Sequence, residues 1–335
     1  MPKMLHLVDK VALDGVTRTL ASVLPRLQGR CEHELRQLTA NDDLQAGTPV
    51  DAVCVHFTVS WANLAHLIAL RHRFAGRLIL FEYTYSAAYE RLCTPYRRQL
   101  RTMLQFAYGL FDMVVAVSPA QQAWMVKAEL VPPHRLRLIV PSVDLSRLLA
   151  LPFPARHAGP LRLGAYGPLV PQQGFDRLVE AMRLVSPDVA TQRIAGFGPE
   201  AIALRRMAEK LPHVQLEEAV ADPQYFLSEV DAIAIPSRWE PMGLVALESR
   251  AAARPLIVAG IDGLAEQVSP AFGLVVNADS AIDLADGIDR MAAADLPAMA
   301  AAARASVTGD VERDLTQWQG LIEEIIGAEP LLRAS

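Results

Sequence analysis

Cysteine is scarce in this sequence, and long apolar runs are absent. Cys31, Cys54 and Cys93 are spread over 335 residues without a C-x-x-C pair, which argues against a disulfide framework or a zinc ribbon and fits a reducing compartment. No apolar run approaches the roughly 18 residues that a membrane-spanning helix needs. The N-terminal MPKMLHLVDK lacks the layout of a signal peptide. These features predict a cytoplasmic protein.

Aromatic residues make up only 6% of the sequence and charged residues 21%, whereas 52% is hydrophobic. This composition excludes disordered, collagen-like and coiled-coil proteins, and it suffices for two hydrophobic cores. Charge is unevenly divided. Residues 1–155 carry 17 Lys and Arg against 12 Asp and Glu, and residues 156–335 carry 15 against 25. The acidic second half argues against nucleic acid as a partner.

Short apolar runs alternate with segments of helical periodicity along the whole chain. Strands are expected at residues 4–8, 52–57, 78–83, 113–117, 136–140, 161–166, 192–197, 214–216, 232–236, 256–259 and 274–276. Alternation of this kind is typical of α/β proteins with parallel sheets.

A stretch with three prolines, LPFPARHAGP at 151–160, separates two strand–helix series and suits an exposed linker. We therefore predict two Rossmann-like domains, residues 1–155 and 156–305, that face each other across a central cleft. A final helical segment at 306–335 would be able to cross back to the first domain.

The segment with the strongest chemical signal is DAIAIPSRWEPMGLVALESRAAARP at 231–255. Glu240 and Glu248 flank Gly243, where an expected strand passes through a short loop into a helix. The first N–H groups of that helix, at Gly243 and Leu244, would lie at the carboxyl edge of the sheet, where open α/β folds bind anions and nucleotides. Taken singly, Glu240 is also explained by the helix dipole, and Glu248 by a solvated helix position.

The complete pattern, P-S-R-x-E-P-x-G-L-V-x-x-E, resembles the signature of glycosyltransferase family 4. These are retaining, sugar-nucleotide-dependent enzymes with the GT-B fold. The matching residues are Glu240, Pro241, Gly243, Leu244 and Glu248. Further similar segments are RIAGFGPE at 193–200, GIDGLAEQ at 260–267, GLVV at 273–276, DGVTR at 14–18 and DMVVAVS at 112–118.

The resemblance implies a donor site in the second domain. Glu248 would bind the ribose hydroxyls, Glu240 would bind hydroxyls of the transferred sugar, and N–H groups after Met242 would meet donor oxygens. Gly15 and Gly198, in the two glycine turns of the pattern, would border the same donor. The leaving diphosphate would help to deprotonate the acceptor, so no metal or other cofactor is implied.

The implied function is retaining transfer of a hexose from a nucleoside diphosphate sugar to a saccharide or lipid-linked acceptor. The expected product is a bacterial envelope polysaccharide. One stretch departs from the family pattern G-R-x-x-x-x-K-G. GPLVPQQG at 167–174 has Pro168 in place of Arg and Gln173 in place of Lys. In the family, this Arg and this Lys would bind the diphosphate.

Candidate substitutes for these cations are Arg238, Arg254 and Arg18. The departure keeps a second interpretation open, in which the chain is a weak or inactive relative that serves as a sugar-nucleotide binder or assembly partner. A different GT-B chemistry, such as that of a phosphorylase or epimerase, is disfavoured by the signature.

Two candidates for acceptor chemistry lie in the first domain. Glu82 stands near the position where the family commonly carries a His. Two interpretations stay open: Glu82 binds or deprotonates an acceptor hydroxyl, or it is an ordinary glutamate at the end of a strand. His56 follows another expected strand, and it would face the cleft or be a structural group. No His, Asp or Cys cluster has metal-ligand spacing along the sequence, so no metal site is expected.

ERLCTPYRRQLRTML at 90–104 combines four arginines with Leu, Met and Tyr. Two interpretations stay open: a basic amphipathic helix on the anionic inner face of a membrane, or an exposed helix that packs on its own core.

Overall fold

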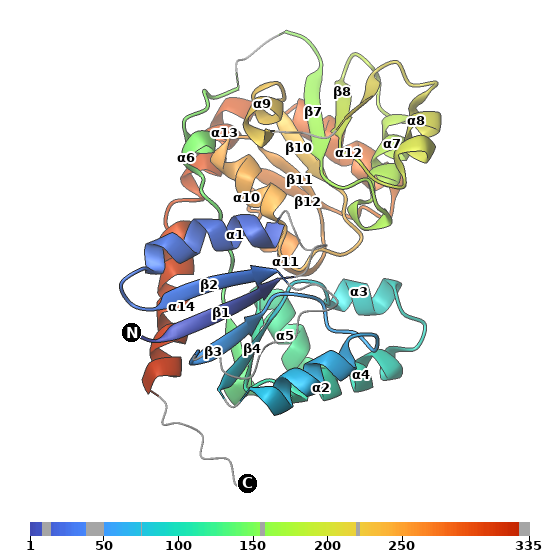
Figure 1. The fold of residues 1–335 in the computed structure, drawn as a ribbon. Helices are drawn as coiled ribbons and strands as arrows, with labels where there is room; N and C mark the ends of the chain where they lie inside the picture. Colours follow the sequence, from blue (N-terminus) through green and yellow to red (C-terminus); the bar gives the residue numbers. More distant parts are fainter. Residues whose placement is uncertain (9–14, 38–49, 75, 155–157, 219–221, 328–335) are drawn as a thin grey trace. The chain divides into compact units, whose positions relative to one another are not determined.

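The computed structural model describes residues 1–8, 15–37, 50–74, 76–154, 158–218 and 222–327. Their strands form two six-stranded sheets in which every strand pairing is parallel (Figure 1). The α/β fold predicted from the alternation of apolar runs and helical segments is therefore confirmed.

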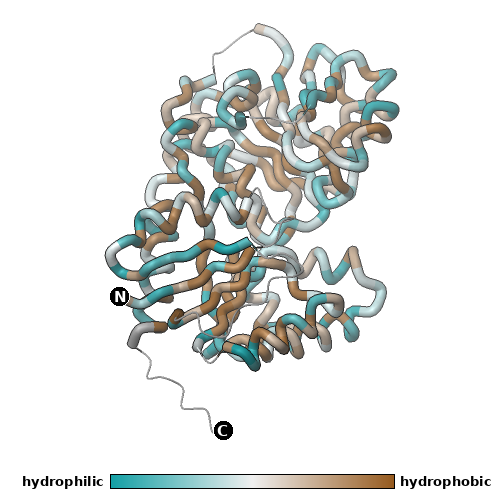
Figure 2. The backbone as a smooth tube through the Cα atoms, viewed as in Figure 1, coloured by the Kyte–Doolittle hydropathy of each residue, from teal (hydrophilic) through white to brown (hydrophobic). Residues whose placement is uncertain are grey.

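Hydrophobic strands lie at the centre of each sheet (Figure 2). In strand β10 (Ala232–Ile235), for example, all four residues are buried. A parallel sheet covered by helices on both faces needs apolar side chains pointing to both sides.

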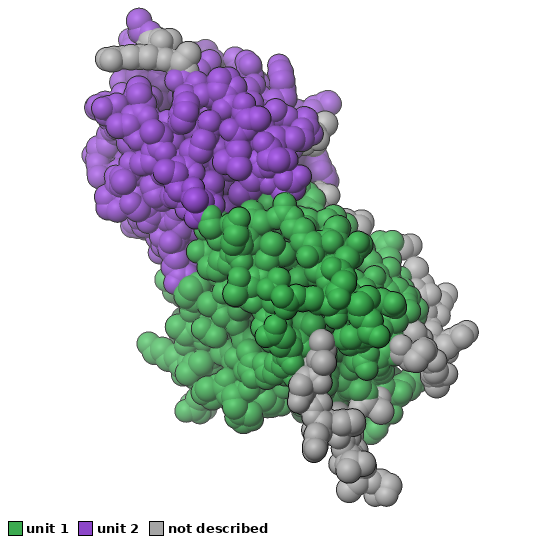
Figure 3. Space-filling model, turned by 90° about the vertical axis from the view of Figure 1, so that its left-hand side faces the viewer, with its two compact units in different colours: residues 1–143, 309–335 green, residues 144–308 purple. Residues whose placement is uncertain are grey.

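The chain divides into two compact units, residues 1–143 with 309–335 and residues 144–308 (Figure 3). The division expected from the sequence had its boundaries at 155/156 and 305/306. The proline-rich stretch thus belongs to the second unit, and its residues 155–157 lie outside the described part of the chain.

The sheet of the first unit has the strand order β2-β1-β3-β4-β5-β6. Its strands are β1 (Lys3–Val8), β2 (Glu32–Gln37), β3 (Ala52–Val55), β4 (Arg77–Glu82), β5 (Met113–Ala116) and β6 (Leu136–Leu138). The main helices are α1 (Gly15–Val23), α2 (Leu64–Arg73), α3 (Ala87–Leu92), α4 (Arg97–Gly109), α5 (Pro119–Lys127) and α14 (Asp310–Gly327). Alternate residues of β1 enter different cores: Leu5 and Leu7 pack with α2, α4 and α5, and Met4 and Val8 with α1 and α14.

Helix α14 completes the first unit although it comes last in the chain. Trp318 is 1% exposed, and its ring stacks on Phe81 of β4 with the centroids 4.8 Å apart. The Asp314 carboxylate accepts hydrogen bonds from the Ser142 amide (2.9 Å) and hydroxyl (2.6 Å). The helix therefore packs, together with α1, on one face of this sheet.

The sheet of the second unit has the order β12-β11-β10-β7-β8-β9. Its other strands are β7 (Leu161–Tyr166), β8 (Ala190–Ala195), β9 (Val214–Glu217), β11 (Leu256–Ala259) and β12 (Gly273–Val276). The helices are α6 (Ser146–Leu149), α7 (Phe175–Met182), α8 (Ala201–Ala208), α9 (Pro223–Ser228), α10 (Leu244–Ala251), α11 (Asp262–Ala265), α12 (Ala281–Ala292) and α13 (Leu296–Ala305). Strands β11, β10, β7 and β8 are neighbours, so their carboxyl ends meet at one edge.

The expected helix at 90–104 is wrong as a single element. Helix α3 ends at Leu92 and α4 begins at Arg97, with Pro95 between them, because proline lacks the N–H that a continuous helix needs. Among the helices of the described residues, none combines the length and hydrophobicity that crossing a bilayer requires.

Replacing Trp318 with Ala tests the contribution of α14. Loss of this buried ring should lower the free energy of unfolding by about 3–5 kcal/mol, because it leaves a cavity against Phe81. The matched control is Trp61→Ala, since Trp61 is 61% exposed and its loss should change stability by less than about 0.5 kcal/mol. Urea denaturation followed by circular dichroism measures both. Equal stability of the two variants would contradict this role of α14.

Candidate functional site

The candidate site is built from the loops that follow β7, β8, β10 and β11 in the second unit. These loops comprise residues 167–174, 196–200, 236–243 and 260–261. Because the four strands are parallel neighbours, all four loops leave the sheet at its carboxyl edge. Open α/β sheets bind their ligands at this edge.

The loops after β7 and β8 contact each other through their backbones. The Leu169 N–H donates to the Phe197 carbonyl (2.7 Å), and the Glu200 N–H donates to the Leu169 carbonyl (3.0 Å). A Cβ at Gly198 would collide with the Leu169 carbonyl oxygen, and the φ of Gly198 is +153°. Glycine is therefore required at this position.

The loop after β7 is also joined to the loop after β10. The Arg238 N–H donates to the Gln172 carbonyl (2.7 Å), and the Gln172 side-chain amide donates to the Trp239 carbonyl (3.1 Å). Gly174 has a φ of +68°, and a Cβ there would collide with the Pro236 carbonyl oxygen. These contacts fix Gln173 beside the loop that carries Glu240.

Glu240 is half-buried between two polar neighbours. The Gln173 side-chain amide donates a hydrogen bond to its carboxylate, and the Glu240 N–H donates to Asp262 Oδ2 (3.2 Å). Burial and the Asp262 carboxylate raise the pKa of Glu240 to about 7, and the Gln173 hydrogen bond opposes this rise. Asp262 has a φ of +40°, a strained value for a residue with a side chain, and such strain clusters at functional sites.

Gln267, which follows α11, braces the turn before α10. Gly243 has a φ of +88°, and its carbonyl accepts a hydrogen bond from the Gln267 side-chain amide (3.0 Å). The same amide donates to the Met242 carbonyl, and Arg250 donates to Gln267 Oε1 (3.2 Å). No side chain caps the start of α10, so the first N–H groups at Gly243 and Leu244 are suited to an anion.

Glu248 lies inside α10 and is 1% exposed, so its interpretation as a solvated helix position is wrong. The Tyr166 hydroxyl, at the end of β7, donates to Glu248 Oε2 (2.6 Å). Tyr166 gives no functional signal in the sequence, because it stands as the last residue of an apolar strand. Asp262 and Gln267 were missed as well, although both lie in the GIDGLAEQ segment.

The candidate substitutes for the missing cations have other partners. Arg238 forms a bidentate ion pair with Asp176 (2.8 and 2.5 Å) and donates to the Pro171 carbonyl (2.7 Å). Arg254 is 1% exposed, donates to the Leu227 carbonyl (2.6 Å), and burial lowers its pKa to about 10. Arg18 belongs to α1 of the first unit.

Glu82 of the first unit is 2% exposed, and its carboxylate accepts three hydrogen bonds. The donors are the Thr84 N–H (2.7 Å), the Tyr85 N–H (3.0 Å) and the Tyr108 hydroxyl (2.8 Å). Burial raises the pKa of Glu82, and these donors lower it. This geometry favours the strand-end interpretation, in which Glu82 stabilises the turn after β4.

His56 is 1% exposed, and both of its ring nitrogens have partners: His6 (3.0 Å) and Tyr83 (3.2 Å). Burial lowers the pKa of His56 to about 3, so its ring is neutral at physiological pH. Gly15 is the first residue of α1, and the preceding Asp14 lies outside the described residues.

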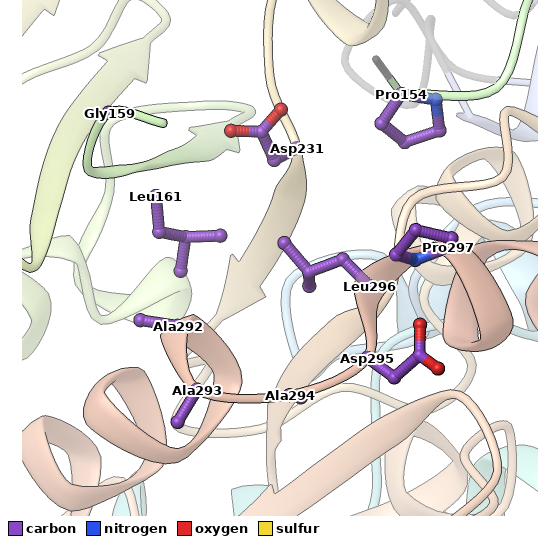
Figure 4. Close-up of a pocket in the computed structure, with 10 residues that line it drawn as sticks. All are labelled: Pro154, Gly159, Leu161, Asp231, Ala292, Ala293, Ala294, Asp295, Leu296 and Pro297. Atoms are coloured by element: carbon purple, nitrogen blue, oxygen red, sulfur yellow. The ribbon is translucent and has the colours of Figure 1, made fainter. Parts of the chain in front are cut away.

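A cavity of about 510 Å³ lies elsewhere in the second unit (Figure 4). Leu161, Asp231 and Leu296 are among its lining residues. Since Leu161 begins β7 and Asp231 directly precedes β10, the cavity is at the amino edge of the sheet, opposite to Glu240. The Asp231 carboxylate is paired with Arg162 (2.6 Å), so we assign this cavity no part in the site.

The chain is similar to known glycosyltransferases in sequence and in fold. Residues 160–294 match the family "Glycosyl transferases group 1". A stretch of 131 residues is 35% identical to glycogen synthase of Mycobacterium tuberculosis, covering 35% of this chain and 30% of that protein. The chain spans 30–40% of the length of the first curated relatives that it matches.

The matched segment, residues 160–294, extends from β7 to α12 and contains all four loops of the candidate site.

Solved structures show the GT-B fold over the chain. Sucrose-phosphate synthase from Thermosynechococcus elongatus has a TM-score of 0.78 at 18% identity, covering 98% of this chain and 100% of that one. HepE from Anabaena in complex with UDP has a TM-score of 0.75 at 18% identity, covering 97% and 100%. The GT-B fold predicted from the sequence is confirmed.

Glu240 should make the stability of the second unit depend on pH. A carboxyl group whose pKa rises on folding stabilises the native state below its unfolded pKa, and this contribution is lost as the pH rises through the folded value. Between pH 4.5 and 7, wild type should therefore lose up to about 3 kcal/mol relative to Glu240→Gln. Urea denaturation at several pH values measures the difference.

Glu209→Gln, at an exposed glutamate of the same unit, is the matched control and should follow wild type across this pH range. If the Glu240→Gln and wild-type curves stay parallel, the environment assigned to Glu240 is incorrect.

Proposed function

We propose that the chain is a retaining glycosyltransferase that moves a hexose from a nucleoside diphosphate sugar to a saccharide or lipid-linked acceptor, in the synthesis of a bacterial envelope polysaccharide. The main support is the placement of Glu240, Gly243 and Glu248 around the start of α10. HepE, which shares the fold, is known in complex with UDP and with UDP-glucose.

Each part of this site has a chemical task in the proposed transfer. The uncapped start of α10 favours the negative diphosphate through its N–H groups and dipole. The Glu240 carboxylate accepts sugar hydroxyls. Gln173 hydrogen-bonds this carboxylate, and Asp262 holds the Glu240 backbone through its N–H. Charge develops on the diphosphate as the glycosidic bond breaks, so donors aimed at its oxygens lower the barrier. No step requires a metal or another cofactor.

Glu248 would bind the ribose in this proposal, and Tyr166 constrains how. Because Glu248 is 1% exposed and holds the Tyr166 hydroxyl at 2.6 Å, a ribose reaches the carboxylate only if that hydroxyl shares it or moves aside. Tyr166 is itself 7% exposed. A carboxylate accepts several hydrogen bonds at once, so sharing is chemically feasible.

A second candidate function, binding of a sugar nucleotide without rapid transfer, is favoured because the arginines of the site are already ion-paired. Pro168 and Gln173 supply no charge, and Arg238 and Arg177 are ion-paired with Asp176 and Asp279. A diphosphate would have to compete with these carboxylates for the guanidinium groups. This arrangement suits a protein that binds a sugar nucleotide without rapid transfer, as an assembly partner of other enzymes.

Nucleotide binding tests what the two candidates share. Among UDP, GDP and ADP, one should raise the melting temperature of wild type, and Glu248→Gln should weaken its affinity by about tenfold, as expected for loss of a charged hydrogen bond. Glu209→Gln is the control and should bind as wild type does. If wild type hydrolyses or transfers the donor sugar and Glu240→Gln does not, the result supports the enzyme. Nucleotide binding without turnover selects the binder, and the absence of nucleotide binding contradicts both.

We also propose that the first unit contacts an anionic membrane surface, as a peripheral protein on the inner face. The support is a set of exposed apolar and basic residues on α3, on α4 and in the break between them. Leu92, Tyr96 and Phe106 are 44%, 65% and 51% exposed, and Arg97 and Arg98 are exposed beside them. Arg101 instead pairs with Glu90 (3.1 Å).

Reversing the charge of both exposed arginines, in Arg97→Glu/Arg98→Glu, should reduce cosedimentation with anionic liposomes, because each cation near such a surface contributes about 1 kcal/mol. The matched control is Arg205→Glu/Arg206→Glu, an adjacent exposed pair on α8 of the other unit. Equal loss in both double variants, or no loss in the first, would reject a membrane surface at this position.

A further inference from the structure

Three metal-ligating side chains meet in the core of the first unit, and the proposed function uses none of them. His6 of β1, Cys54 of β3 and His56, which follows β3, each offer one ligand atom, and these atoms lie within 4.8 Å of one another. The residues are 0%, 0% and 1% exposed.

Strand pairing explains why the sequence spacing conceals this cluster. His6 and Cys54 are partners in the parallel pairing of β1 with β3, and His56 follows Cys54 by two positions, on the same face of the sheet. Trp318 of α14 covers that face, with its ring centroid 5.9 Å from that of His6. The expectation that the chain has no metal site was based only on the spacing of these residues along the sequence.

The ring nitrogens are arranged as in a metal site. His6 Nδ1 and His56 Nε2 face each other at 3.0 Å. Two imidazole nitrogens that bind one ion at about 2.0–2.1 Å lie about 3.3 Å apart in tetrahedral geometry and about 3.5 Å apart in the trigonal geometry of three ligands. A small displacement would therefore admit an ion between these two atoms and the Cys54 sulfur.

The outer nitrogens of both rings also have partners. His6 Nε2 is 3.0 Å from His33 Nδ1, and His56 Nδ1 is 3.2 Å from the Tyr83 hydroxyl. Metal-binding histidines almost always donate their second ring N–H to an acceptor, commonly a carboxylate, a backbone carbonyl or water, which fixes the tautomer and the ring orientation. The His33 nitrogen and the Tyr83 oxygen are able to accept in the same way. With an ion in place, His6 would donate to His33 and His56 would donate to Tyr83.

We propose that His6, Cys54 and His56 form a binding site for a thiophilic metal ion, with Cu⁺ preferred over Zn²⁺. Thiolate and imidazole ligands suit both ions. A Cu⁺ thiolate with two neutral imidazoles carries no net charge, whereas the Zn²⁺ complex would bury one positive charge in an apolar core, which is costly. Structural Zn²⁺ also takes four ligands, and the cluster in the described residues has three.

The test uses the full chain, stripped of metal and kept reduced without oxygen. One equivalent of Cu⁺ should bind and raise the melting temperature, because a ligand that binds only the native state stabilises it. X-ray absorption at the copper edge should show one sulfur and two nitrogen neighbours. This measurement on wild type does not depend on whether any variant folds.

Cys54→Ser should weaken Cu⁺ binding by more than the 10–100-fold that loss of a second-shell partner typically causes, and Tyr83→Phe should fall within that range. Cys31→Ser, in the same core, and Cys93→Ser, at an exposed cysteine, are the matched controls and should bind as wild type does. Failure to bind one equivalent, copper bound by sulfur alone, or unchanged affinity in Cys54→Ser would overturn the proposal. A larger thermal shift with Zn²⁺ than with Cu⁺ would overturn the choice of ion.

Discussion

Backbone contacts between loops at the carboxyl edge of the second sheet hold the candidate site in shape. The loop after β7 hydrogen-bonds through its main chain to the loops after β8 and β10. Gly174 and Gly198 lie so close to neighbouring carbonyls that a Cβ would collide with them. Main-chain packing of this kind leaves little freedom to Gln173 or Glu240, so their carboxylate–amide pair is set before any ligand arrives.

The electrostatics of the site follow from this packing. Glu240 is held beside Asp262, and burial together with the repulsion between the two carboxylates raises the pKa of Glu240 to about 7. Arg238, the one candidate cation on the same loop, is turned toward Asp176. In the proposed transfer, two acidic side chains would lie beside the sugar, and the diphosphate would depend on the N–H groups of α10 and on guanidinium groups that already have partners.

Most of the fold could be predicted from the sequence because its strands are buried on both faces and read as apolar runs. The exception is β2, with the sequence EHELRQ, which lies at the edge of its sheet and is largely half-buried or exposed. Its polar residues give no strand signal. The basic and apolar residues at 90–104 fit one helical pattern, but Pro95 separates α3 from α4 there.

The candidate site was predictable only in part, for a physical reason. Glu240, Gly243 and Glu248 lie close together in the chain, so their pattern is visible in it. Tyr166 reaches Glu248 only because β7 and β10 are neighbours in the sheet. The His6, Cys54 and His56 cluster depends likewise on the pairing of β1 with β3, which no local pattern reveals.

A crystal structure of the chain with its stabilising nucleoside diphosphate tests the central claim most directly. The account predicts a ribose hydrogen-bonded to Glu248 and a diphosphate at the first N–H groups of α10. A nucleotide bound anywhere else, such as the cavity beside Asp231, would contradict it.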